Sequence, residues 1–339
     1  MAEIGAFVSG CAGPILSEAE RAFFARSNPW GLILFKRNCE NPEQIRTLTA
    51  GFRAAVGRRE APVFIDQEGG RVQRLGPPSN AWRLYPAARA YGDLYLRDPL
   101  AAVRAARQVA RLMAEDLLAA GITANCVPVL DVPQPGSHEV IGNRAYSERV
   151  DHIIALGGAH AAGFLAGGIA PVMKHVPGHG RARADSHLDL PRVDAAPAEL
   201  RAVDFVPFAA LAGLPMAMTA HIVYAALDPS TPATLSRRVI GDTIRGEIGF
   251  DGLLMTDDLS MKALSGTLAE RARRALAAGC DVVLHCSGVL AEMEEVAEAA
   301  GCFSKLAAGR ARRALKMAAK PRRFDRKAAL ASLQSLVAG

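Results

Sequence analysis

The sequence lacks the features that mark secreted, disulfide-stabilised and membrane-spanning proteins. Its six cysteines are dispersed without close pairing, which argues against a disulfide framework and against a structural zinc site. The N-terminus carries the acid Glu3 where a signal peptide has positive charge, and no sustained apolar segment follows. The longest glycine-free helical pattern, 99–120, contains Arg104 and Glu115 among other charges and cannot cross a bilayer. We therefore expect a soluble, cytoplasmic protein with reduced thiols.

Aromatic residues are also scarce, which bears on the basic C-terminal segment 305–327. This segment contains ten basic residues and a single acid, Asp325. Such an excess of charge is one sign of a nucleic-acid or membrane partner. However, Phe324 is the only aromatic residue among the charges, too few for a platform that stacks on bases. We interpret the segment as a solvated helix face and expect neither a nucleic-acid nor a membrane partner.

Short apolar runs alternate with helical patterns about eight times along the chain, with no linker rich in glycine or serine between them. Continuous aliphatic runs are typical of parallel strands that are buried on both faces. Eight such units favour an α/β fold of the (β/α)8 TIM-barrel type over an open sheet. The predicted strands are 6–9, 31–35, 62–66, 124–130, 168–175, 216–221, 252–257 and 282–286.

The helical patterns begin at recognisable signals. Asn41 and Asp98 each precede a proline, which predicts an N-cap followed by proline at the first helical position. We expect one catalytic domain over 1–339, with the barrel at about 5–316 and a basic helical tail at about 317–339. The predicted helices are 18–26, 42–56, 99–120, 151–166, 197–211, 236–248, 268–278 and 289–316.

Polar side chains gather where the predicted strands end, which is where a barrel of this type places its active site. Any one of them alone is more often a helix cap, an ion-pair partner or a hydrogen-bonded rim histidine than a catalytic group. Their convergence on one face indicates a functional site. The side chains at or just after strand ends are Asp66, Arg74, Asp131, Arg144, Lys174, His175, His221, Asp257, Asp258 and His285.

The segment 174–189 is the richest of these strand ends, because it adds His179, Asp185 and His187 to Lys174 and His175. A metal hydrolase is one interpretation, since imidazole and carboxylate groups are zinc ligands. Against it, the first strand ends without a His-x-His pair. In addition, proline and glycine between His175 and His179 prevent the helix that would align them.

A phosphate site is a second interpretation, resting on Lys174, Arg144 and the glycines nearby. It lacks the glycine-rich turn that binds phosphate after the last barrel strands, and Asp257 and Asp258 would repel an anion there.

Glycoside cleavage is the third interpretation. Its oxocarbenium-like transition state needs a carboxylate at the anomeric carbon and a proton donor at the leaving oxygen. Asp257 or Asp258 can supply the carboxylate, and spacing alone does not choose between them. His187 with Asp185 two residues before it can supply the proton, because a neighbouring carboxylate stabilises the charged imidazole.

Five motifs occur in order along most of the predicted barrel: FIDQEGGRV at 64–72, IGNR at 141–144, KHVPGHG at 174–180, DSH at 185–187 and MTDDLSM at 255–261. With these motifs the sequence resembles family 3 glycoside hydrolases, in the bacterial β-N-acetylglucosaminidase branch. Val176 stands where the family commonly has phenylalanine, which is a change of packing more than of chemistry.

The resemblance implies that Asp257 is the nucleophile, that His187 is the acid/base and that Asp185 supports His187. Because the chain ends soon after the predicted barrel, we expect the proton donor to come from the barrel rather than from a second domain. By the same resemblance, five residues bind the sugar: Asp66, Arg74, Arg144, Lys174 and His175.

The resemblance also implies a substrate. The expected reaction removes non-reducing N-acetylglucosamine from muropeptides or chito-oligosaccharides during cell-wall recycling. It proceeds with retention of configuration and needs no metal or other cofactor. The enzyme is expected to be a monomer. A family 3 β-glucosidase or glycoside phosphorylase is the main alternative. A metal-dependent barrel hydrolase and a non-catalytic sugar-binding protein are the more distant ones.

Overall fold

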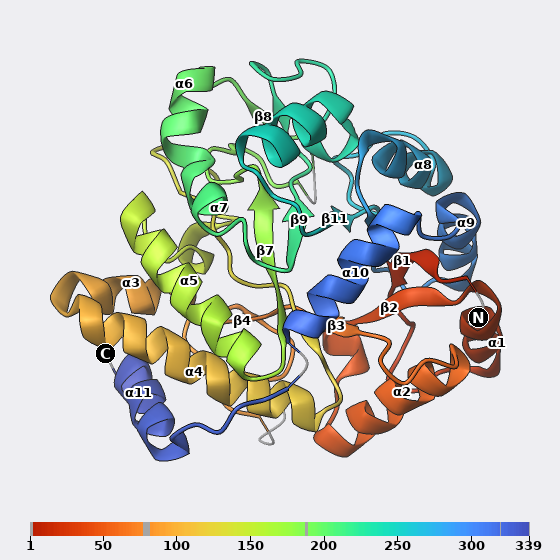
Figure 1. Cartoon of the computed structure of the whole chain (residues 1–339), viewed down its shortest axis with the longest axis horizontal. Helices are drawn as coiled ribbons and strands as arrows, with labels where there is room; N and C mark the ends of the chain where they lie inside the picture. Colours follow the sequence, from red (N-terminus) through yellow and green to blue (C-terminus); the bar gives the residue numbers. More distant parts are fainter. Residues whose placement is uncertain (1–2, 77–81, 187–188, 319, 339) are drawn as a thin grey trace.

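The computed structural model describes residues 3–76, 82–186, 189–318 and 320–338. Eight parallel strands close into a barrel, as the sequence predicted (Figure 1). Around the barrel the order is β1 (Gly5–Ser9), β12 (Val282–His285), β11 (Leu253–Asp258), β9 (Met216–Thr219), β7 (Ala170–Val176), β6 (Ala124–Asn125), β3 (Val63–Ile65) and β2 (Pro29–Leu34), which returns to β1.

Each predicted strand is present, and β6 is the one that differs most from its predicted range of 124–130. Pro128 has no N–H to donate, so regular pairing is interrupted after Asn125. Pairing with β7 resumes at Val129, which forms a bridge opposite Lys174. The segment after β6 therefore still follows β7 toward the end of the barrel.

Helices cover the outside of the barrel (Figure 1). The N-caps predicted at Asn41 and Asp98 are confirmed, since each side chain accepts a hydrogen bond from a backbone N–H in the first turn of its helix. The helices are α1 (Glu18–Ser27), α2 (Pro42–Ala55), α3 (Ala88–Arg97), α4 (Pro99–Ala119), α5 (Val150–Ala166), α6 (Pro197–Glu199), α7 (Val206–Ala210), α8 (Leu268–Ala278), α9 (Leu290–Ala300), α10 (Lys305–Met317) and α11 (Arg326–Ala338).

The helix predicted over 289–316 is wrong, because the structure has two helices there. Gly301, at φ 58°, ends α9, and Ser304 caps the start of α10 by accepting from the N–H of Ala307. The patterns at 197–211 and 236–248 are helical in part through π-type turns, η3 (Leu200–Asp204) and η5 (Val239–Glu247). Helix α3 was not predicted.

Helix α10 closes the N-terminal end of the barrel. Its small residues Ala311 and Ala314, and Ala318 directly after it, share one apolar cluster with strand residues such as Met216 and Val282, which begin β9 and β12. Figure 1 shows α10 lying across the barrel. The opposite end, where the strands finish, is left for the site.

Two short sheets outside the barrel shape that end. Strands β4 (Gln67–Gly69) and β5 (Val72–Gln73) form an antiparallel hairpin directly after β3, and β8 (Arg192–Val193) pairs with β10 (Val223–Tyr224). Gly69 turns the hairpin at φ 97°, and a side chain there would meet the Pro86 carbonyl oxygen at 2.2 Å. Glycine is therefore required at this position.

The basic segment 305–327 does not form one solvated helix face, so that interpretation is wrong for part of it. Its residues are divided between α10, the non-helical stretch 320–325 and the start of α11. Within the described ranges, no helix is both long enough and apolar enough to span a membrane.

Candidate active site

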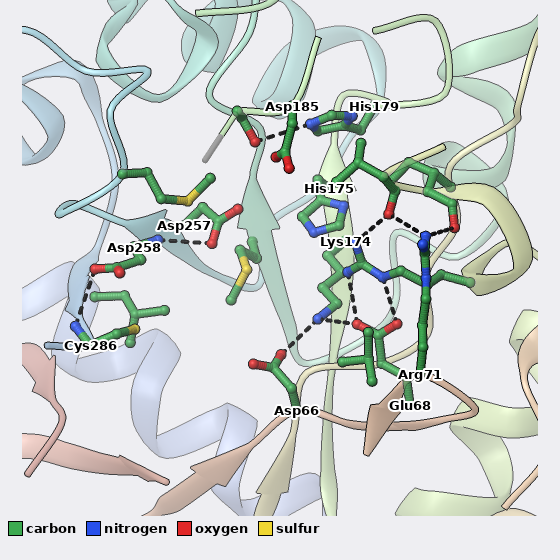
Figure 2. Close-up of a pocket in the computed structure, with 18 of the residues that line it drawn as sticks. Asp66, Glu68, Arg71, Lys174, His175, His179, Asp185, Asp257, Asp258 and Cys286 are labelled. Carbon is green, nitrogen blue, oxygen red and sulfur yellow. Dashed lines mark hydrogen bonds and ion pairs between the residues drawn. The ribbon is translucent and has the colours of Figure 1, made fainter. Parts of the chain in front are cut away.

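A cavity of about 530 Å³ opens at the C-terminal end of the barrel strands. Its lining includes seven of the eight residues to which the family resemblance gives a catalytic or sugar-binding role, and Figure 2 shows several of them pointing inward. The eighth, His187, lies outside the described residues. The seven are Asp66, Arg74, Arg144, Lys174, His175, Asp185 and Asp257.

One wall of the cavity is a network of alternating charges. Lys174, at the end of β7, places Nζ 2.8 Å from Asp66 Oδ1 and 2.7 Å from Glu68 Oε1. Arg144 donates to both oxygens of Glu68, from Nε at 2.9 Å and Nη2 at 2.8 Å. Arg74 reaches the other oxygen of Asp66 at 3.1 Å.

The network keeps its carboxylates ionised. Burial by itself would raise the pKa of Glu68, but Arg144 and Lys174 outweigh it and lower that pKa to about 2. The same balance, with Lys174 and Arg74 as the cations, holds the pKa of Asp66 far below its usual range. Burial opposes the charge of Lys174, yet Asp66 and Glu68 raise its pKa. At neutral pH the wall presents fixed charges to a ligand.

Asp131, which follows β6, holds the end of β7 in place. Its side chain is fully buried, and Oδ2 lies 2.7 Å from His175 Nδ1. Its Oδ1 accepts from the backbone N–H groups of His175 at 3.1 Å and His179 at 2.7 Å. One carboxylate thereby fixes both the His175 ring and the backbone that leads into the loop.

The adjacent carboxylates of Asp257 and Asp258, at the end of β11, have different surroundings. The Asp258 carboxylate accepts from the N–H groups of Ser260 and Cys286, each at 3.1 Å, and from the Ser260 hydroxyl. Asp257 accepts from the Asp258 N–H at 2.8 Å, and Figure 2 shows its carboxylate on the cavity side. Both aspartates line the cavity, but the oxygens of Asp258 are engaged by Ser260 and Cys286, whereas the carboxylate of Asp257 accepts only from the Asp258 N–H among the described residues.

The pKa of Asp257 is also set by its neighbours. Burial would raise this pKa, but His175, His221 and Lys174 together lower it below its usual value. His221 is itself buried, with Nδ1 2.7 Å from the Thr234 hydroxyl and Nε2 3.0 Å from the Asp258 carbonyl oxygen. An ionised carboxylate thus lies in a concave pocket beside groups that favour its charge.

Comparison with known proteins identifies this architecture. The model of the glycosyl hydrolase family 3 N-terminal domain matches residues 13–315. The chain belongs to glycosyl hydrolase family 3. It is 42% identical over 288 residues to a β-hexosaminidase from Alkalilimnicola ehrlichii, covering 84% of this chain and 81% of that one. A β-hexosaminidase from Pseudomonas aeruginosa is 40% identical over 286 residues, covering 84% and 82%.

Comparison with solved structures gives a similar result. NagZ from Neisseria gonorrhoeae, in complex with N-trifluoroacetyl-D-glucosamine, superposes with a TM-score of 0.84 at 34% identity, covering 99% of this chain and 96% of that one. This family 3 protein is an enzyme of the β-hexosaminidase type, and the predicted family and barrel are confirmed.

The loop of this family 3 enzyme that follows β7 is anchored at its base. Tyr224 donates its hydroxyl hydrogen to the Gly178 carbonyl at 2.7 Å, and Arg181 Nε lies 2.7 Å from Asp204 Oδ2. His179 is buried, and its Nε2 lies 3.4 Å from the Ser186 hydroxyl. Asp185 lines the cavity. His179 therefore helps to anchor this loop.

Glu68 and Asp131 are site residues that were not predicted from the sequence. Glu68 lies inside the motif at 64–72, where a carboxylate two residues after Asp66 was a usable signal. Asp131 was noticed as a strand end, but its three hydrogen bonds depend on loop geometry that spacing does not show. Among the described residues, no group of three His, Cys, Asp or Glu side chains is placed to hold a metal ion.

Proposed function

We propose that this enzyme removes non-reducing terminal β-linked N-acetylglucosamine from muropeptides, including N-acetylglucosaminyl-1,6-anhydro-N-acetylmuramic acid and its peptide-bearing forms. The observation that carries the proposal is the ionised carboxylate of Asp257 in a cavity whose opposite wall is a network of fixed charges. The relatives named β-hexosaminidase and the NagZ complex with an N-acylated glucosamine support this choice of sugar.

Asp257 is the proposed nucleophile. Its lowered pKa keeps it ionised at neutral pH, as attack on an anomeric carbon requires. The surroundings of Asp258 support the same choice, because its oxygens are occupied by Ser260 and Cys286. The sequence alone left these two residues equivalent.

His187 is the proposed acid/base, assigned by the family resemblance. Asp185, two residues before it, lines the cavity and would stabilise the imidazolium. The loop anchors at Gly178 and Arg181 support this role, since they fix the base from which the Asp185 segment extends.

The proposed reaction has two displacement steps. In the first, an Asp257 oxygen bonds to the anomeric carbon while the bond to the leaving oxygen breaks, and His187 gives that oxygen its proton. In the second, His187 takes a proton from water as the water oxygen attacks the anomeric carbon and releases the Asp257 carboxylate. Two displacements at one carbon give overall retention.

The charged wall is the proposed sugar-binding surface. Asp66, Arg74, Arg144, Lys174 and His175 offer donors and acceptors whose charge strengthens hydrogen bonds to neutral hydroxyl and amide groups. Glu68 is the proposed positioning residue of this surface, since it holds Lys174 and Arg144 through three contacts.

We further propose that the enzyme works as a cytoplasmic monomer in peptidoglycan recycling, and so contributes to cell-wall biogenesis, cell shape and division. Its six cysteines are free thiols, four of them buried, which suits a reducing compartment. Muropeptides, the proposed substrate, are products of cell-wall turnover that recycling would bring into the cytoplasm.

A direct comparison of substrates tests the sugar and the reaction class. We expect hydrolysis of 4-nitrophenyl N-acetyl-β-D-glucosaminide to exceed that of the matching β-glucoside by at least about a hundredfold. Chelator should leave the rate unchanged, and phosphate should not appear in the product. Preference for the glucoside, loss of activity with chelator, or formation of a sugar 1-phosphate would support one of the alternatives instead.

A further inference from the structure

A second cavity, of about 300 Å³, lies between α4 and the non-helical stretch before α11. Figure 1 shows α11 beside α4, so the stretch before it crosses the flank of the barrel. The cavity brings together part of the basic C-terminal segment with a row of arginines one turn apart on α4. Its five arginines are Arg104, Arg107, Arg111, Arg322 and Arg323.

Arg111 is a buried cation without a carboxylate partner among the residues that the structure describes. It is 6% exposed, and its guanidinium lies 4.7 Å from the centre of the Phe324 ring. Its Nη2 donates to the Arg322 carbonyl oxygen, whereas Nε and Nη1 are buried without a hydrogen-bond partner in the described ranges. A buried charge usually pairs with an opposite charge, because desolvation without pairing is costly.

The acids near this cavity offset only part of its positive charge. Asp325 lines the cavity, but its Oδ1 accepts from the Ala328 N–H at the start of α11. Glu115, one turn beyond Arg111 on α4, lies 3.0 Å from Arg326 and 3.9 Å from Arg83. Burial, Arg107 and Arg322 all lower the pKa of Arg111, so an anion beside it would relieve an unfavourable field.

We propose that this cavity is a binding site for a small multivalent anion, specifically a phosphate or a phosphomonoester. Guanidinium groups bind phosphate oxygens in pairs, and five of them around one cavity suit an anion with more than one charge. The volume admits a phosphate with a small organic group. Phe324 is packed against Arg111, so it is not available to stack on the bases of a nucleic acid.

The site lies away from the catalytic cavity. The Arg322 N–H donates to the carbonyl of Ala166, the last residue of α5, at 2.8 Å, near the N-terminal end of β7. The catalytic cavity is at the opposite end of the strands. A bound anion would link α4 to the stretch 322–325, which leads into α11. We therefore expect it to raise the stability of the folded protein and to leave hydrolysis unchanged.

The test is titration of the full-length enzyme with inorganic phosphate and with glucose 6-phosphate, at constant ionic strength, by calorimetry and by thermal unfolding. The pocket variant is Arg104→Gln/Arg107→Gln, which removes two exposed arginines from the cavity. The control is Arg46→Gln/Arg59→Gln, which removes the same charge from exposed positions elsewhere. Hydrolysis of the 4-nitrophenyl substrate is measured for each protein.

We expect the wild type and the control to bind with Kd below about 1 mM and to gain thermal stability, with binding about tenfold weaker or more in the pocket variant. Hydrolysis without added anion should be equal in all three proteins. Undetectable binding of both phosphate and glucose 6-phosphate, or equal binding by the pocket variant, would overturn the proposal.

Discussion

Asp257 and Asp258 are chemically identical neighbours with separate surroundings. The carboxylate of Asp258 is held by the N–H groups of Ser260 and Cys286, while Asp257 lies beside cationic and imidazole groups at the cavity. Both carboxylates line the cavity, so the difference lies in their hydrogen bonds: those of Asp258 are satisfied within the fold, which leaves Asp257 as the carboxylate available for reaction. The assignment of the nucleophile thus depends on contacts that sequence spacing does not reveal.

Replacement of each aspartate should separate the two roles. We expect Asp257→Ala to lower kcat by at least about a thousandfold, because it removes the carboxylate proposed to form the covalent intermediate. Its Tm should change little. Asp258→Ala should lower Tm through the lost turn contacts while keeping measurable turnover. If Asp257→Ala kept more than about a tenth of the wild-type kcat, the nucleophile would be misassigned.

Glu68 offers a second test at the level of single residues. Glu68→Gln removes the charge that holds Lys174 and Arg144, so we expect KM to rise about tenfold or more with a smaller change in kcat. Glu139→Gln is the matched control, since Glu139 is exposed at the rim of the same cavity. Equal KM values for the two variants would contradict the positioning role.

At the scale of elements, Asp131 joins the segment after β6 to β7 and to the loop that carries Asp185. Burial opposes its charge, but His175, His179 and their hydrogen bonds lower its pKa to about 2 from an ordinary 3.8. A depressed carboxylate pKa stabilises the folded state above the ordinary value. That contribution is lost as pH falls from about 4 toward 2.

This linkage predicts a pH-dependent difference between the wild type and Asp131→Asn. We expect the variant to be less stable at pH 6 by about 2 kcal/mol, and the difference to shrink toward pH 2 because the wild-type carboxylate is then protonated. Urea unfolding at both pH values measures it. A difference that stays constant with pH would show that the Asp131 charge does not stabilise this junction.

The elements also show which signals the sequence carried. Buried aliphatic runs located all eight strands, and the caps at Asn41 and Asp98 located two helix starts, because these signals are local. The break between α9 and α10 was missed because a few residues around Gly301 interrupt an otherwise continuous pattern. The β4–β5 hairpin was missed as structure, although its motif was recognised.

At the scale of the whole molecule, the C-terminal helices complete the barrel in different ways. Helix α10 closes the N-terminal end with alanines, whereas α11 packs beside α4 through Ala329, Leu333 and Leu336, which are buried. The sequence predicted a helical tail but not its packing. The sequence of a basic, amphipathic segment does not show which surface its apolar side packs against.

The packing of α11 predicts a measurable contribution to stability. We expect Leu333→Ala, at 7% exposure, to lower the free energy of unfolding by about 2 kcal/mol, as for other buried leucines at the low end of their range. Val337→Ala on the same helix, at 57% exposure, should change it by less than about 0.5 kcal/mol. Equal effects in urea unfolding would mean that α11 is not anchored through its buried face.

The central claim concerns the whole enzyme: hydrolysis of a β-N-acetylglucosaminide by two displacements at one anomeric carbon. Proton NMR of the reaction with 4-nitrophenyl N-acetyl-β-D-glucosaminide, recorded before the sugar mutarotates, tests it most directly. The account predicts that the first-formed product is the β-anomer of N-acetylglucosamine. The α-anomer as first product, or no hydrolysis at all, would contradict it.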